Sequence, residues 1–203
     1  MNIIFRKLFK NIPPEKEGEY LLKRANASAY QVFIDSKFRQ LVDFDKQSQV
    51  EQDRIFNELV VTAVVYIMLM IDSKLNEERV KPERIHFWMK LRDMIPGLYV
   101  NFLKGLGIAG EHLNIWKKLI DLRWSEHKGE QKNTRSAWAR EFAEHPDKNV
   151  LNETAVRLET VTVGVMLHIT RGQAKTNADD PLRRHLRTWL STLEYKLWKR
   201  VGW

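Results

Sequence analysis

The sequence predicts an all-α bundle of six or seven helices. Apolar residues recur at helical spacing along nearly the whole chain, and prolines and glycines stand where helices would begin or end. Two long apolar stretches, at 59–71 and 161–169, have the composition of central, mostly buried helices. With 203 residues, of which 43% are hydrophobic and 30% charged, residues 15–203 are expected to form a single helical domain.

The first half of the chain is expected to form four helices. Residues 1–12 have the pattern of a short amphipathic, basic helix that Pro13-Pro14 would end, so 1–14 is set apart as an N-terminal segment. Helices follow over 17–43 and 49–75, and the second of these contains the first apolar stretch. Pro82, a residue favoured in the first helical turn, begins a helix that is expected to kink or break at Pro96-Gly97 and to end at Gly105.

Glycines at 105, 107 and 110 form the expected joint to the second half. A helix over 110–127, a polar loop over 128–133 and a shorter helix over 134–144 follow. The helix over 147–171 contains the second apolar stretch; its residues 160–170 alternate as a strand would, but the helical spacing of the flanks favours helix. Asp180-Pro181 has the pattern of an N-cap followed by a first-turn proline, and it begins a last helix that reaches about residue 200.

Three short matches, in the same order, raise the hypothesis of an internal duplication with pseudo-twofold symmetry. Segments 33–38 and 119–124 match each other, and each apolar stretch precedes a Pro-x-Arg-x-His segment, so the repeat halves would be 15–105 and 111–203. The histidines weaken the match, because His86 points away from the apolar face of its helix whereas His185 lies beside its own. The duplication and a chance similarity both stay open, since repeats carry weight only when their burial patterns agree.

Charge and composition limit the classes of function. A net charge of +8 and an isoelectric point near 9.6 favour acidic partners, although acidic and basic residues are interleaved. The absence of cysteine excludes a disulfide framework, a thiolate metal site and a cysteine nucleophile. No apolar run approaches the roughly 20 residues of a membrane span, and no secretory signal pattern is present. We therefore expect a cytoplasmic protein, with a peripheral position on the inner face of a membrane as an alternative.

The N-terminal segment has one apolar and one cationic face. A membrane-surface helix has this pattern, and so does a helix that docks on its own bundle or on a partner protein. The cations that would meet lipid phosphates or another acidic surface are Arg6, Lys7 and Lys10, and the apolar face is formed by Ile4, Phe5, Leu8, Phe9 and Ile12.

The last helix is the second candidate surface. Arg184, Arg187 and Trp198 lie opposite its apolar stripe, where they would bind a protein partner or the phosphates and bases of a nucleic acid. The plainer interpretation is a solvated basic face. Glu194 is expected on the same side and weakens the case for phosphate binding.

A carboxylate-bridged metal centre is disfavoured. Glu58 and Glu159 begin the two apolar stretches and Glu83–His86 is a Glu-x-x-His motif, but Leu182 replaces the glutamate of the second motif that such a centre needs. His168 is interpreted as a core or boundary histidine, which would become a ligand or base only if a carboxylate faced it. No metal and no other cofactor is expected.

Together these patterns predict a non-catalytic interaction protein, that is, a subunit, adaptor or accessory factor that binds another protein. A nucleic-acid-binding protein that uses the basic last helix and a peripheral membrane protein anchored by residues 1–12 are the alternatives, and self-association is left open. The residues expected at the partner contact are Phe5, Phe9, Arg184, Arg187 and Trp198.

Overall fold

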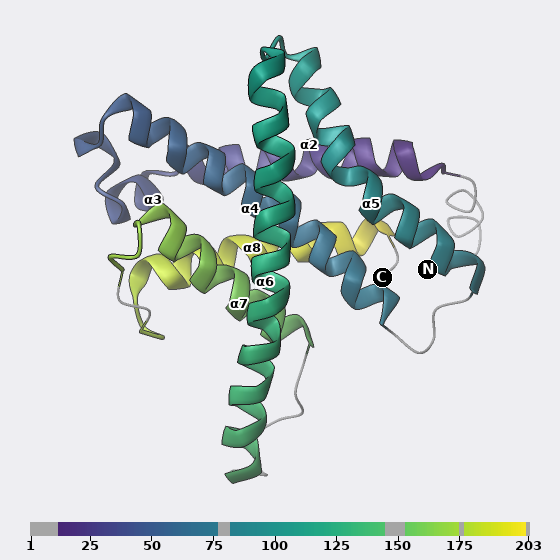
Figure 1. Ribbon diagram of the computed structural model, residues 1–203. Coiled ribbons are helices and arrows are strands. Elements are labelled where there is room, and N and C mark those ends of the chain that lie inside the picture. The colour runs from purple at the N-terminus through teal and green to yellow at the C-terminus, as the bar shows by residue number, and fades with distance from the viewer. Residues whose placement is uncertain (1–11, 77–81, 145–152, 175–176, 202–203) are drawn as a thin grey trace.

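One apolar helix, α4 (Gln49–Leu75), lies at the centre of the computed structural model (Figure 1). The structure describes residues 12–76, 82–144, 153–174 and 177–201, and this part of the chain is helical and contains no strand. Ser48 caps α4, since its side chain accepts a hydrogen bond from the Glu51 backbone N–H at 3.3 Å. Every residue from 58 to 71 is buried, because α4 packs against α2, α5, α6, α7 and α8. The predicted all-α bundle, its central helix and the bounds of that helix are confirmed.

The helix expected over 17–43 is two helices, so this prediction was wrong. α2 (Pro14–Phe33) ends at Ile34, and α3 (Ser36–Leu41) and the 3-10 turn η2 (Phe44–Lys46) follow. Asp35 causes the break, because its carboxylate accepts a hydrogen bond from the Phe38 backbone N–H at 2.8 Å and so caps a new helix.

A kink or a break was expected at Pro96-Gly97; α5 (Pro82–Gly105) runs through Pro96, so there is no break, although a proline removes one backbone hydrogen bond. The glycine joint is confirmed: Gly107 has a left-handed φ of 86°, and its N–H donates to the Lys104 carbonyl at 3.0 Å to end the helix.

α6 (Gly110–Glu144) is continuous, so the loop expected over 128–133 is absent. The residues there are lysine, glutamate, glutamine and asparagine around Gly129, and most of them form helices well. One exposed glycine costs only about 1 kcal/mol, which the packing of the rest of the helix outweighs. Figure 1 shows the C-terminal end of α6 reaching beyond the other helices, whereas its start lies beside the end of α5.

α7 (Glu153–Ile169) and α8 (Pro181–Val201) complete the bundle. The helical interpretation of the alternating segment 160–170 is confirmed over α7, and residues 147–152 lie outside the described part. Arg54 of α4 holds the end of α7, since its guanidinium donates to the carbonyl oxygens of His168 and Ile169, both at 2.7 Å. These bonds satisfy carbonyls that a helix end leaves without intrahelical partners.

The two segments that begin the proposed repeat lie in different settings. Residues 33–38 span the break between α2 and α3, whereas residues 119–124 lie inside α6. The internal duplication therefore stays a hypothesis.

Candidate functional site

The last helix is fixed at its start and along one side. The Asp180 carboxylate accepts hydrogen bonds from the backbone N–H groups of Leu182 at 2.8 Å and Arg183 at 3.1 Å, so the predicted N-cap is confirmed. The Trp189 indole N–H donates to the Ser28 hydroxyl of α2 at 2.8 Å. The apolar stripe packs inward and is formed by Leu182, Leu186, Leu190, Leu193 and Leu197. One face of α8 is thereby directed at solvent.

The outer face of α8 is defined here as Arg184, Arg187, Tyr195 and Trp198, which are all exposed. Tyr195 is 60% and Trp198 48% exposed, and they lie three residues apart, which makes them neighbours on a helix. Arg184, Arg187 and Trp198 were predicted on this face, and Tyr195 was missed. Its position one turn before Trp198 is the signal in the sequence that would have found it.

Ion pairs divide the arginines of α8 into two kinds. Arg187 donates to one oxygen of the buried Glu159 at 2.9 Å, and Arg183 hydrogen bonds to the other oxygen. Arg184 has no hydrogen-bond or ion-pair side-chain partner within the described residues. The unpaired positive charge of this face is therefore centred on Arg184.

Glu194 is not on the outer face, which corrects the sequence-based expectation. Its side chain is buried and bonds to Arg157 of α7 at 2.5 Å and to the hydroxyl of Tyr66 of α4. Arg157 also donates to Ser73 at 2.5 Å. Burial is the main cause that raises the pKa of Tyr66 above its usual range. This polar network joins α4, α7 and α8 through the core, and it removes the one acidic group that the outer face was expected to carry.

A second polar cluster lies where α4, α6 and α7 meet. Glu58 accepts two hydrogen bonds from Arg123, at 2.9 and 3.3 Å, and Arg123 also pairs with Glu126 at 3.1 Å. His168 Nε2 lies 3.1 Å from a Glu126 oxygen. A carboxylate therefore does face His168, as the sequence-based hypothesis required, but an arginine already binds it.

His127 is the buried histidine of this cluster, and no pattern in the sequence marked it. It is 1% exposed, and its ring lies 6.2 Å from that of His168. Its Nε2 has no hydrogen-bond partner among the residues that the structure describes. Burial, together with the nearby His168 and Arg123, lowers the pKa of His127 to about 3. Burial and then Arg123 also lower the pKa of His168, against an opposing effect of Glu126. His127 is thus an uncharged core residue near neutral pH.

These contacts bear on the metal hypothesis. Glu58 and Glu159, the two carboxylates that it required, are both bound by arginines. Within the described ranges, no three histidine or acidic side chains gather in a group able to hold a metal ion.

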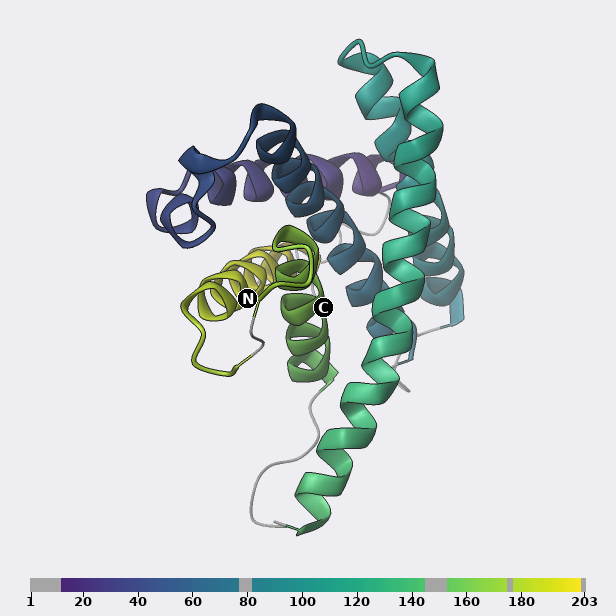
Figure 2. The same cartoon turned by 60° about the vertical axis from the view of Figure 1, so that its left-hand side comes forward.

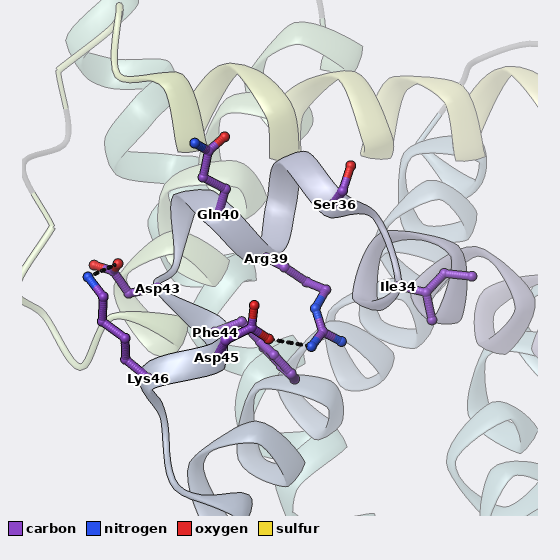
Figure 3. Close-up of a pocket in the computed structure, with 8 residues that line it drawn as sticks. All are labelled: Ile34, Ser36, Arg39, Gln40, Asp43, Phe44, Asp45 and Lys46. Atoms are coloured by element: carbon purple, nitrogen blue, oxygen red, sulfur yellow. Dashed lines mark hydrogen bonds and ion pairs between the residues drawn. The ribbon is translucent and has the colours of Figure 1, made fainter.

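An open pocket of about 570 Å³ lies at the corner of α2, α3 and η2 (Figure 3). Its charged side chains pair within its wall: Arg39 with Asp45 at 2.5 Å, and Lys46 with Asp43 at 2.6 Å. The Arg39 guanidinium also stacks over the Phe44 ring at 4.2 Å. The pocket therefore presents neutralised charges, unlike the outer face of α8.

The predicted N-terminal contacts lie outside the described residues, namely Phe5, Arg6, Lys7, Phe9 and Lys10. Within the described part, α4 alone is long and apolar enough to cross a membrane by length and composition. Since 83% of its most apolar window is buried in the bundle, α4 fits the core helix of a globular fold equally well.

Comparison of the chain with protein-family models, curated protein sequences and solved structures finds no match.

Proposed function

We propose that this chain is a non-catalytic interaction protein, a subunit or adaptor that binds another protein through the outer face of α8. The observation that carries this proposal is the exposed aromatic pair, Tyr195 and Trp198, on a helix that also presents the unpaired Arg184. Tryptophan, tyrosine and arginine are the residue types that most often dominate the energy of protein interfaces.

The rigidity of α8 supports the same proposal. The Asp180 cap, the leucine stripe and the Trp189–Ser28 bond hold the helix on the bundle. A partner therefore meets a surface that is already ordered, which lowers the entropy cost of binding. The ion pairs of Glu159 with Arg183 and Arg187 fix the guanidinium groups at one edge of the face.

Charge indicates the chemistry of the partner. The chain carries a net charge of +8, and Arg184 is available for a bidentate bond to a carboxylate. The expected partner presents an apolar cleft for Trp198 beside an acidic group for Arg184. A cytoplasmic location is proposed with it.

The experiment is affinity purification with quantitative mass spectrometry from the native host at native expression, using wild type and single variants. Trp198→Ala and Arg184→Glu are each expected to reduce recovery of a stoichiometric protein partner at least about tenfold. Tyr30→Ala is the matched control, because Tyr30 is a 51% exposed tyrosine on α2 and its loss should leave recovery unchanged. Absence of a stoichiometric partner, or equal recovery with all variants, would overturn the proposal.

Nucleic-acid binding is the second candidate, favoured by the net charge and by the burial of Glu194 away from the outer face. The ion pairs of Arg183 and Arg187 count against it, because they occupy cations that phosphates would need. Fluorescence anisotropy with single- and double-stranded oligonucleotides between 50 and 200 mM salt tests it. Binding that weakens steeply with salt and is lost in Arg184→Glu would replace the protein-partner proposal.

The membrane alternative depends on residues 1–12. Co-sedimentation with anionic phosphatidylserine vesicles, compared between the full chain and a chain lacking residues 1–12, tests it directly. Binding by the full chain alone would favour a peripheral membrane protein.

A further inference from the structure

α6 leaves the bundle at His127. Among the described side chains of α6, that of His127 is the last one that is buried, and those of residues 128–139 are exposed or half-buried. Figures 1 and 2 both show the C-terminal end of the helix extending past its neighbours. Residues 127–144 are called the distal end of α6 below.

Beyond His127, the distal end meets α7 through polar side chains. The hydroxyls of Thr134 and Thr160 lie 3.1 Å apart. Arg135 pairs with Glu153 at 2.5 Å, and both of these side chains are exposed to solvent. Because an exposed ion pair contributes little to stability, these contacts alone hold the distal end weakly.

The His127 imidazole packs directly on the backbone of α7. Gly164 makes this approach possible, because a Cβ at its position would lie 2.2 Å from the Cε1 atom of His127. The Nε2 atoms of His127 and of Gln131, one turn later, have no hydrogen-bond partner among the described residues. Since a buried polar atom without a partner costs free energy, the closed contact is only weakly stabilised.

The charges around His127 oppose its protonation in the closed structure. The charged or titratable side chains described where α4, α5, α6 and α7 meet are Glu58, Asp72, Arg92, Arg123, Glu126, Lys128 and His168. Arg123 and His168 act on His127 directly, and both disfavour a positive charge there. All three carboxylates already bind an arginine. A proton on His127 would therefore have no carboxylate of its own to offset it.

We propose that protonation of His127 in acid releases the distal end of α6 from α7, while the preceding part of α6 stays on the bundle. Two contacts one turn earlier anchor that part: Arg123 donates to Glu58 at 2.9 Å, and the Trp124 indole N–H donates to Asp72 at 3.0 Å. In the released state the imidazole reaches water, where its charge is solvated. This acid-dependent release goes beyond the proposed function and does not depend on it.

Proton linkage sets the size of the effect. Burial, His168 and Arg123 lower the pKa of His127 to about 3 in the closed structure, whereas its ordinary value is 6.5. Above pH 6.5 both states are uncharged at His127, and below it the released state binds more protons. The ratio of released to closed molecules is therefore expected to rise about 25-fold from pH 7 to pH 5.

Hydrogen exchange of the full-length chain, followed by NMR at pH 7 and pH 5, tests the release. After correction for the intrinsic pH dependence of exchange, the protection of the amides of residues 128–139 is expected to fall about 25-fold. This fall should be the same with and without about 1 M urea, because the release exposes little surface, whereas urea should lower the protection of the α4 amides.

Two histidine variants assign the effect. His127→Met should remove the pH dependence of protection in residues 128–139, because the side chain no longer takes up a proton. His112→Gln is the matched control and should retain it, since His112 is an exposed histidine of the same helix. Circular dichroism confirms that each variant is folded.

A reversible crosslink gives a second test that needs no change at His127. The chain has no cysteine, and the Thr134 and Thr160 hydroxyls are 3.1 Å apart, so Thr134→Cys with Thr160→Cys should form a disulfide across the contact. The oxidised form should keep residues 128–139 protected at pH 5, and the same protein after reduction should lose this protection.

Three results would overturn the proposal. The first is protection of residues 128–139 that is equal at pH 7 and pH 5. The second is a fall in their protection with urea as large as that of the α4 amides, which would assign their exchange to global unfolding. The third is an undiminished pH dependence in His127→Met or in the oxidised disulfide form.

Discussion

Acidification from pH 7 to pH 5 is expected to lower the free energy of unfolding by about 2 kcal/mol through His127 alone. In the folded chain this imidazole is 1% exposed and its pKa is lowered to about 3. In the unfolded chain it titrates near its ordinary value of 6.5. The folded state therefore stays uncharged over a pH range in which the unfolded state takes up a proton.

The difference between the folded and unfolded pKa of His127 sets the direction and the size of this change in stability. Above pH 6.5 both states are neutral at His127 and its contribution is complete. Below pH 6.5 the unfolded state binds more protons, so stability falls by up to about 1.4 kcal/mol per pH unit, and the loss continues until the folded pKa near 3 is reached. The lowered pKa of His168 adds a loss of the same sign.

Urea unfolding followed by tryptophan fluorescence at pH 7, 6 and 5 measures the effect. The variant is His127→Met, which replaces the imidazole by a flexible, uncharged side chain of similar size. The control is His112→Gln, because His112 is an exposed histidine of the same helix. We expect the pH dependence to be shallower by about 2 kcal/mol in His127→Met and unchanged in His112→Gln.

Two results would refute this reasoning. A wild-type free energy of unfolding that is constant between pH 7 and 5 would show that His127 is not buried as a neutral base. A His127→Met variant that is as pH-sensitive as the wild type would assign the effect to other groups.

Two further predictions concern the polar core and use the same urea assay. Gly164→Ala should lower the free energy of unfolding by about 1–3 kcal/mol, because a Cβ at this position would lie 2.2 Å from the Cε1 atom of the buried His127. Gly129→Ala should raise the free energy of unfolding by about 0.5–1 kcal/mol, because a Cβ there would meet no other atom. Equal effects of the two alanines would contradict the packing described. Glu194→Gln should lower the free energy of unfolding by about 3 kcal/mol or more, because it leaves the buried Arg157 without its negatively charged partner. The double variant Arg157→Met, Glu194→Leu should lower it by less, because it removes both buried charges together. A double variant that is less stable than the single one would show that the ion pair itself stabilises the fold.

Local patterns determined the helical elements with the strongest signals. The apolar stretch and its flanks predicted α4 at Gln49–Leu75, and Asp180-Pro181 predicted the start of α8. These predictions succeeded because capping groups and helical periodicity act within a few residues of one another. The polarity of residues 128–133 led to the wrong prediction of a loop within α6. Most of these residues have good helix propensity and lie around a single glycine, so the helix continues through them.

The candidate surfaces were predicted only in part. Arg184 and Trp198 were placed on the outward side of α8 correctly, since the opposite stripe of leucines is visible in the sequence. Glu194 was wrongly predicted on the outer face, because it lies at the edge of the apolar stripe of α8. At such a position a carboxylate is buried only if a cation faces it, and the cation here, Arg157, comes from a different helix. The exposure of Ile115 and Leu122 was likewise hidden until the packing side of α6 was known.

The sequence by itself therefore determined the fold class, the central helix and the basic aromatic side of the last helix, because these depend on spacing along one helix. Only the tertiary structure decided which polar groups are buried together and which apolar groups are left outside. The contacts of His127 with Gly164 and His168, and of Tyr66 with Glu194, join residues from different helices. The spacing of residues within one helix contains no information on how neighbouring helices cross, and that crossing fixes the chemistry of each of these positions.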